Sequence, residues 1–434
     1  MPKVALVGAG SRVFTRRLVS DLTRFFGNDV EIRLIDIDPE KLQWAERLAL
    51  RIREEAHCLP LVKAFSERRP AFESCDYVIN AINVGGRVAW SRDFEIPARY
   101  GVRQTVADTL GIGGIMRALR TIPEVLKIAR DLEAVAPRAR LLNYTNPMSM
   151  VMLALFKTSS LPALGLCHSV PATAKQLAHY LDMDLAELEW QAAGINHQSW
   201  FLQLSRHGQD LYPTLRQRLP RIYEQDRVRF EIMRRFGYFS SESSSHAAEY
   251  VSYFLPRDPW MQRLHLVPRE FLDQPGSLAE IATLLEQPEP VYLPEFSIEY
   301  APQVIHSLET GTVRVIEVNV PNTGLIANLP ASAIVEVPAL VQGHQVLPTS
   351  VGKLPEALAA LNRQGIAVQQ LTIEGVLERR RESIYQAAFL DPNLSTTLDL
   401  DQIVSLTDEL LAAHAGYIPP LELSWGRDVP LAFR

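Results

Sequence analysis

Cysteine and histidine side chains occur in this sequence in a pattern that suits a metal site. In the stretch GLCHSVPAT, residues 165–173, Cys167 is followed directly by His168, and the stretch GINHQ, residues 194–198, supplies His197. A thiolate and an imidazole are ligands that transition metals accept, and two protein ligands leave coordination positions open, as catalysis requires. On the softness of these ligands alone, we expect zinc or iron.

Taken one at a time, these side chains are more often structural than catalytic. Cysteine is among the most buried residue types, and a single histidine usually serves as a hydrogen-bonded structural residue. The metal interpretation gains weight because Cys167 lies at the end of one predicted strand, beside the polar His168, and His197 at the end of another. Ligands of open α/β sheets bind at the carboxyl ends of the strands.

A dinucleotide site is predicted at the start of the chain. The apolar run KVALVG, residues 3–8, indicates a strand, which leads through Gly8, Gly10 and Ser11 into a helical pattern. Such a turn presents free backbone N–H groups and the positive end of a helix to a pyrophosphate. Val13 occupies the position of the third glycine of the usual fingerprint, so the glycines alone are weak evidence.

The next predicted strand strengthens this interpretation. The run EIRLIDID contains Asp36, where a carboxylate accepts hydrogen bonds from ribose hydroxyls and repels a 2′-phosphate, so NAD is favoured over NADP. Strand and helix patterns then alternate, which predicts a parallel sheet with right-handed crossovers. The polar residues expected at the strand ends of this sheet are Asn83, Asn143, Asn146 and Cys167.

The pattern changes after about residue 190, and we expect two closely packed parts. These are a Rossmann-type nucleotide-binding domain over residues 1–190 and a mixed α+β domain over residues 191–434, which would bind substrate and metal. The elements expected in the second part are strands on both sides of His197, helices over 214–236, 354–390 and 400–414, and antiparallel strands within 312–341 joined by a Pro-Asn-Thr-Gly turn.

The composition narrows the class of protein. The chain has 434 residues, of which 47% are hydrophobic and 22% charged, as is ordinary for a soluble globular protein. A net charge of −6 argues against nucleic acid or an anionic membrane as the main partner. The three cysteines are a poor disulfide framework, and no apolar run is long enough to span a membrane. We therefore expect a cytoplasmic protein.

Several motifs together resemble one family along nearly the whole chain. They are GAGS, DIDP, VADTLGIGGIMRALRTIPEVL, NYTNPM, GLCHSV, GINH, GYFSSESSSHAAEY and NTGLIANLP. This set is similar to the NAD- and Mn²⁺-dependent glycosidases of glycoside hydrolase family 4, which depart from the two-carboxylate scheme of most glycosidases. The resemblance implies a lactate/malate dehydrogenase-like fold. The residues CHSV resemble the branch that acts on unphosphorylated α-galactosides such as melibiose.

The resemblance also implies a role for individual residues. Cys167 and His197 would bind Mn²⁺, Asn146 would contact the sugar and Asp108 would lie near the reacting sugar. The NAD site would contain Gly8, Gly10, Ser11, Asp36 and Asn83.

Two proton-transfer roles follow from the same resemblance. His168 stands where phospho-glucosidases of the family carry an acidic residue after the cysteine, so it is the candidate acid for the leaving group. A base is expected in residues 243–254, with Tyr250 favoured over Tyr253 and His246.

The reaction implied by the resemblance is redox chemistry on the sugar. Oxidation at C3 acidifies the C2 proton, a base removes it, the C1 group is eliminated, water adds at C1, and C3 is reduced again. The implied partner is a small sugar, and the implied assembly is a homodimer or homotetramer. Alternatives are a family 4 α-glucosidase or uronic-acid glycosidase, an NAD-dependent hydroxy-acid dehydrogenase, and a non-enzymatic NAD-sensing module.

Overall fold

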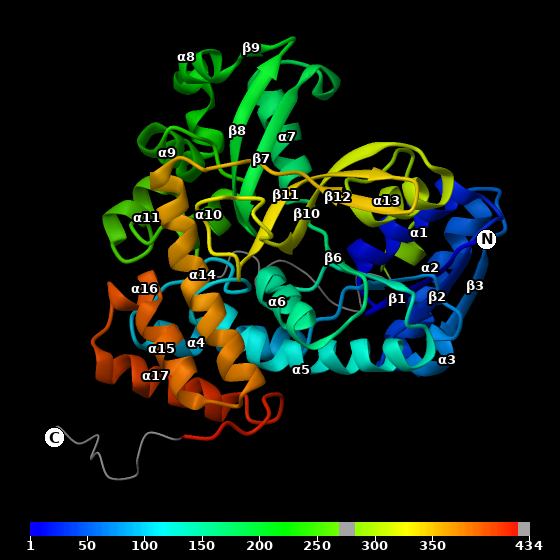
Figure 1. The fold of residues 1–434 in the computed structure, drawn as a ribbon, viewed down its shortest axis with the longest axis horizontal. Coiled ribbons are helices and arrows are strands. Elements are labelled where there is room, and N and C mark those ends of the chain that lie inside the picture. Colours follow the sequence, from blue (N-terminus) through cyan, green and yellow to red (C-terminus); the bar gives the residue numbers. More distant parts are fainter. Residues whose placement is uncertain (269–282, 424–434) are drawn as a thin grey trace.

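One mixed β-sheet runs through both parts of the chain (Figure 1). The computed structural model describes residues 1–268 and 283–423, apart from the side chains of Arg12 and Val13. The strands are β1 (Lys3–Val7), β2 (Glu31–Ile35), β3 (Leu61–Phe65), β4 (Tyr77–Asn80), β5 (Arg140–Asn143), β6 (Ala163–Gly165), β7 (Glu189–Ile195), β8 (Gln198–Arg206), β9 (Gln209–Asp210), β10 (Arg314–Pro321), β11 (Ile334–Gln342) and β12 (Gln345–Pro348). They are hydrogen-bonded in the order β3-β2-β1-β4-β5-β6-β10-β11-β7-β8-β9, and β12 pairs with β11.

The part of the sheet from β3 to β6 is parallel and confirms the predicted nucleotide-binding fold. In β1, Val4 and Leu6 pack into one core cluster and Ala5 and Val7 into another, because successive side chains of a strand point to opposite faces. The helices between these strands are α1 (Arg12–Phe26), α2 (Pro39–Glu55), α3 (Arg68–Phe72), α4 (Gly86–Arg99), α5 (Gly111–Val135), α6 (Met148–Thr158) and, after β6, α7 (Ser169–Tyr180). Residues of α1 and α2 cover one face, and residues of α5 and α6 cover the other.

The second part adds antiparallel strands and further helices. Figure 1 shows the C-terminal helices packed beside α4 and α5. The elements are η1 (Leu185–Glu187), α8 (Tyr212–Ile222), η2 (Tyr223–Gln225), α9 (Arg227–Phe236), α10 (Ser244–Tyr250), α11 (Asp258–Leu264), α13 (Tyr300–Thr310), α14 (Glu356–Leu377), α15 (Arg381–Leu390), α16 (Pro392–Ser395) and α17 (Leu400–Ala413). Within the described ranges, no helix combines the length and the apolar character needed to cross a membrane.

Three details of the second part differ from the sequence-based expectation. The helical pattern over 354–390 forms two helices, α14 and α15, with Arg379 in a left-handed conformation (φ +56°) between them. The pattern over 214–236 forms two helices, because Asp226 leaves the helical region and its carboxylate accepts hydrogen bonds from the hydroxyls of Tyr180 and Ser244. The Pro-Asn-Thr-Gly stretch is not a tight turn between two strands. Residues 322–333 form a longer connection, in which the Asn322 amide donates to the carbonyls of residues 326, 329 and 330.

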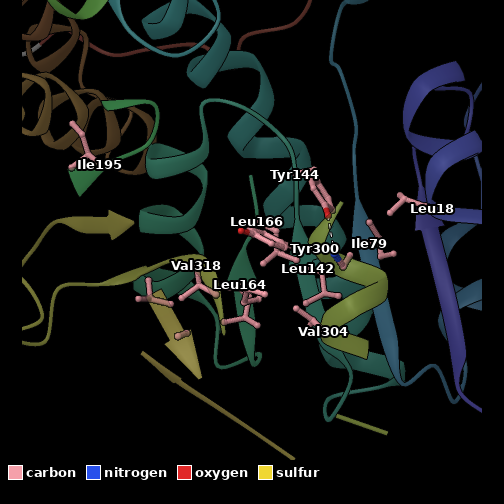
Figure 2. Packing of buried hydrophobic residues seen from close by; sticks show 14 of the residues in the cluster. Leu18, Ile79, Leu142, Tyr144, Leu164, Leu166, Ile195, Tyr300, Val304 and Val318 are labelled. Carbon is pink, nitrogen blue, oxygen red and sulfur yellow. Dashed lines mark hydrogen bonds between the residues drawn. The ribbon is translucent and has the colours of Figure 1, made fainter. Parts of the chain in front are cut away.

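A shared core joins the two parts. The sheet passes from one to the other where Gly165 of β6 pairs with Asn319 of β10. Figure 2 shows Leu142 and Leu164 of the first part packed near Val304 and Val318 of the second, all in one buried cluster. The division into domains at residue 190 stays a prediction.

Candidate active site

The glycine turn after β1 has the shape that a dinucleotide needs. Gly8 has φ +83°, and a Cβ on it would lie 2.8 Å from the backbone oxygen of Ala81. A Cβ on Gly10 would lie 2.8 Å from Oδ2 of Asp36, which accepts a hydrogen bond from the Gly10 N–H at 2.8 Å. The bare glycines therefore leave backbone exposed to a ligand and bring the turn against the acidic residue at the end of β2.

The other residues predicted for the dinucleotide lie beside this turn and along the same edge. Ser11 is the N-cap of α1, and its hydroxyl accepts from the N–H of Phe14 at 3.4 Å. Asn83 is exposed in the connection between β4 and α4, where its carbonyl accepts from Gly86. Asn143, in contrast, is buried and uses its amide within the protein, donating to the carbonyl of Thr145.

A cysteine, a histidine and a carboxylate converge beyond the end of β6. One ligand atom each from Cys167, His197 and Glu242 lie within 4.8 Å of one another. Burial raises the pKa of the Cys167 thiol well above its usual value and lowers the pKa of His197 to about 4. His197 is therefore neutral at neutral pH, which is the form that binds a metal.

A hydrogen-bond chain fixes which nitrogen of His197 is free. The Thr109 hydroxyl donates to Oδ1 of Asp108 at 2.7 Å, and the same hydroxyl oxygen lies 3.2 Å from Nδ1 of His197. Because a hydroxyl has one proton, Thr109 accepts from Nδ1–H, and the lone pair of His197 is on Nε2. Such an outer partner is typical of a histidine that binds a metal.

Asp108 is held as a carboxylate among donors. Its Oδ2 accepts a hydrogen bond from the amide of Asn146 at 3.0 Å and lies 4.0 Å from the Arg117 guanidinium. Its Oδ1 lies 3.7 Å from Nε2 of His246. Burial alone would raise the pKa of Asp108, but His246 and Arg117 outweigh it, and the pKa lies below its usual value. Asn146, the predicted sugar contact, is thus hydrogen-bonded to Asp108, the residue predicted to lie near the reacting sugar.

Helix α10 brings two further groups to the same place. The Tyr250 hydroxyl accepts from the backbone N–H of His197 at 3.0 Å, and burial raises its pKa well above the usual value. Glu249 accepts from the backbone N–H groups of Thr105, Val106 and Ala107 at 2.7, 2.8 and 3.0 Å. This carboxylate therefore holds the loop that leads to Asp108.

His168 faces a different set of groups. Its Nδ1 lies 3.4 Å from Oε1 of the buried Glu299, which also binds Arg17 at 2.9 Å. Burial alone would lower the pKa of His168, but the hydrogen bond and charge of Glu299 reverse this effect and raise the pKa. Tyr253, a weaker candidate base, is 68% exposed.

The structure therefore brings Asp108, Asn146, Cys167, His197 and Tyr250 together, with His168 next along the chain. Sequence reasoning missed Glu242, Thr109, Glu249 and Glu299. The motif GYFSSESSSHAAEY contains Glu242 and Glu249, but their partners are distant in the sequence. Thr109 directly follows Asp108, which was the one available signal for it.

The fold and the side-chain cluster define a class: an enzyme built on a dinucleotide-binding sheet, with side chains of the types that bind metals at its ligand-binding edge. The chain belongs to family 4 of the glycosyl hydrolases. The family model "Family 4 glycosyl hydrolase" matches residues 3–183, and the model of the family's C-terminal domain matches residues 192–394. The family predicted from the sequence motifs is thus confirmed.

Individual relatives agree with this assignment. The chain is 40% identical over 431 residues to an alpha-galactosidase of Bacillus subtilis (strain 168), covering 96% of this chain and 99% of the relative. It is 30% identical to an alpha-galacturonidase of Thermoanaerobacterium saccharolyticum, covering 96% of each. A 6-phospho-beta glucosidase of Thermotoga maritima, whose structure contains manganese, NAD⁺ and glucose-6-phosphate, has a TM-score of 0.78 at 22% identity and covers 97% of this chain and 100% of its own. This last similarity supports the predicted fold.

Proposed function

We propose that this glycosidase hydrolyses unphosphorylated α-galactosides, such as melibiose, through temporary oxidation of the sugar with NAD⁺ and Mn²⁺. The observation that carries the redox mechanism is the meeting of Asn146, Asp108, Cys167 and His197 at the ligand-binding edge of a dinucleotide fold. The sugar is supported by the 40% identity to an alpha-galactosidase, against 30% to the alpha-galacturonidase.

The residues present fit both cofactors. The crowded glycines and the carboxylate of Asp36 suit NAD⁺, and the thiol of Cys167 with the free Nε2 of His197 suits a transition metal. When bound, NAD⁺ supplies a reversible hydride acceptor and Mn²⁺ supplies a Lewis acid for oxygens of the sugar.

The protein's own groups orient the sugar and move protons. Asn146, held by Asp108, binds a sugar hydroxyl. Tyr250 takes the C2 proton as a phenolate, which the backbone N–H of His197 stabilises, and becomes a neutral phenol, while the electron pair of the broken C–H bond stays on the sugar. His168 gives a proton to the leaving oxygen from Nε2, while Glu299 holds the Nδ1 side of its ring.

The first experiment measures nitrophenol release from nitrophenyl α-galactoside, with NAD⁺, Mn²⁺ and thiol each omitted in turn from protein freed of bound cofactor. We expect activity to need all three, and Cys167→Ser to lose most activity at low Mn²⁺ with partial recovery in excess. Cleavage without NAD⁺ would refute the redox mechanism.

A panel of sugars separates the alternatives. Cleavage of nitrophenyl α-glucoside or of an α-galacturonide in preference to the α-galactoside would keep the family and replace the proposed sugar. Net NADH production on a hydroxy acid would indicate a dehydrogenase, since the proposed cycle returns its hydride. Light scattering of the purified protein tests the expected homodimer or homotetramer.

A further inference from the structure

Glu242 lies in the connection between α9 and α10, and its carboxylate faces the two predicted metal ligands. A carboxylate oxygen of Glu242 lies within 4.8 Å of both the Cys167 sulfur and a ring nitrogen of His197. We propose that Glu242 is a third protein ligand of the metal ion. The inference rests on the proposed function, because it concerns the same metal.

The backbone around Glu242 is held in a way that serves this position. Glu242 has φ +71°, a left-handed conformation that side chains other than glycine adopt at a cost. The buried guanidinium of Arg229 donates to the Glu242 carbonyl, and Arg229 is itself bound by Asp226 and by Gln176. A buried ion pair therefore fixes a strained residue whose side chain points toward the cluster.

Negatively charged groups around the cluster of Cys167, His197 and Glu242 favour a bound cation. Cys167 is buried, its sulfur lies within 4.8 Å of a carboxylate oxygen of Glu242, and the carboxylate of Glu336 is buried on the same side. Glu336 is buried next to the connection that carries His197 and accepts from the amide of Asn196 at 3.4 Å. A divalent ion between Cys167 and Glu242 would balance the negative charge that these groups bring together.

A carboxylate also changes which metal the cluster prefers. Sulfur and imidazole alone favour zinc or iron, whereas an added carboxylate oxygen suits Mn²⁺. Oε1 of Glu242 lies 3.3 Å from Nδ1 of His246, which would be the outer partner of a ligating carboxylate.

A second group of side chains competes for this role. Asp108, His197 and His246 also converge within 4.8 Å. The Nδ1 of His197 is engaged by Thr109, and Oδ2 of Asp108 by Asn146, so both members already have partners on that side. The cluster with Cys167 and Glu242 adds a sulfur ligand to the same histidine, and it is the one that we favour.

The test measures Mn²⁺ binding rather than turnover. The full-length protein, saturated with NAD⁺ and without sugar, is titrated with MnCl₂ while free Mn²⁺ is followed by electron paramagnetic resonance. Loss of an outer partner of a metal ligand costs about 10- to 100-fold in affinity. Loss of a direct ligand should cost at least as much, so we expect Glu242→Gln to weaken binding about 100-fold, like Cys167→Ser, and the exposed control Glu295→Gln to change nothing.

A second variant distinguishes loss of a metal ligand from a change in the surrounding structure that weakens Mn²⁺ binding indirectly. Glu242→Cys should shift the preference from Mn²⁺ toward Zn²⁺ by tenfold or more, since it exchanges an oxygen ligand for sulfur. The proposal is overturned if Glu242→Gln weakens Mn²⁺ binding less than tenfold, or if Glu242→Cys leaves the preference unchanged. It is also overturned if Asp108→Asn has a larger effect than Glu242→Gln. Failure of the wild-type protein to bind Mn²⁺ would instead refute the proposed function.

Discussion

Replacing Thr109 by valine removes one hydroxyl at the centre of the candidate site. Thr109 is buried, and its hydroxyl donates to Asp108 at 2.7 Å and accepts from Nδ1–H of His197 across 3.2 Å. Valine has nearly the same shape, so the packing is kept and the hydrogen bonds are lost. His197 then has either an unsatisfied buried N–H, at a cost of about 1–3 kcal/mol, or the other tautomer, with its proton on Nε2.

Both outcomes weaken metal binding. An unsatisfied N–H no longer orients the ring, and a proton on Nε2 occupies the position of the metal. Loss of such an outer partner costs about 10- to 100-fold in affinity, equivalent to about 1.4–2.7 kcal/mol. We therefore expect Thr109→Val to raise the dissociation constant for Mn²⁺ by this factor, and to lower kcat/KM on nitrophenyl α-galactoside when Mn²⁺ is limiting.

The matched control is Thr109→Ser, which keeps the hydroxyl and deletes a methyl group. Mn²⁺ titration of both variants with NAD⁺ present, together with their thermal unfolding, separates loss of the hydroxyl from loss of packing. We expect Thr109→Ser to bind Mn²⁺ within threefold of the wild-type protein. Equal affinities for the valine and serine variants would refute the assignment of the His197 tautomer.

Three further predictions concern the scaffold. An alanine at position 8 would have to adopt φ +83°, with its Cβ 2.8 Å from the Ala81 backbone oxygen. We expect Gly8→Ala to lower the free energy of unfolding by about 1–2 kcal/mol through the backbone conformation, and to weaken NAD⁺ binding at least tenfold in calorimetry. Unchanged binding would contradict this. Asp93 and Arg120 form a buried ion pair, and both side chains are 0% exposed. Asp93→Asn should therefore lower the free energy of unfolding in urea by about 3–5 kcal/mol, and the double variant with Arg120→Met should recover part of this loss. A loss under about 1 kcal/mol would argue against the pair. Burial raises the pKa of Asp391 from 3.8 in the unfolded chain to about 6 in the folded protein. Between about pH 4 and pH 6 the unfolded chain has lost this proton while the folded protein still holds it, so the free energy of unfolding falls as the pH rises through this range. Asp391→Asn keeps the Oδ1 acceptor of the helix cap and should be up to about 3 kcal/mol more stable than wild type at pH 7 but not at pH 4; an equal difference at both pH values would refute this.

The elements of the nucleotide fold were predictable because their signals are local. The β-branched run before Gly8 and the acid Asp36 after the next strand are each read within a few residues. Cys167 and His197 could be singled out because their side-chain chemistry is rare and both follow predicted strands.

The groups that complete the candidate site could not be predicted in this way. Glu249 acts on the backbone of residues 105–107, and Glu242 depends on a left-handed conformation that Arg229 holds. Both are tertiary effects with no periodicity in the sequence. The Pro-Asn-Thr-Gly stretch shows the opposite problem, since a strong local turn signal was overruled when the Asn322 side chain organised a longer connection.

The pairing of β6 with β10 limits how family members could be recombined. A Cβ on Gly165 would lie 2.7 Å from the Met148 sulfur and 2.8 Å from Cβ of Asn319, so any other residue here would force its neighbours to move. A chimera that joins the nucleotide-binding half of one relative to the second half of another must therefore keep a bare residue here and a matching strand beside it. A first half produced alone would have an unpaired strand edge at β6, which favours aggregation. Exchanging short segments around the sugar is thus the safer route to a new specificity than exchanging halves.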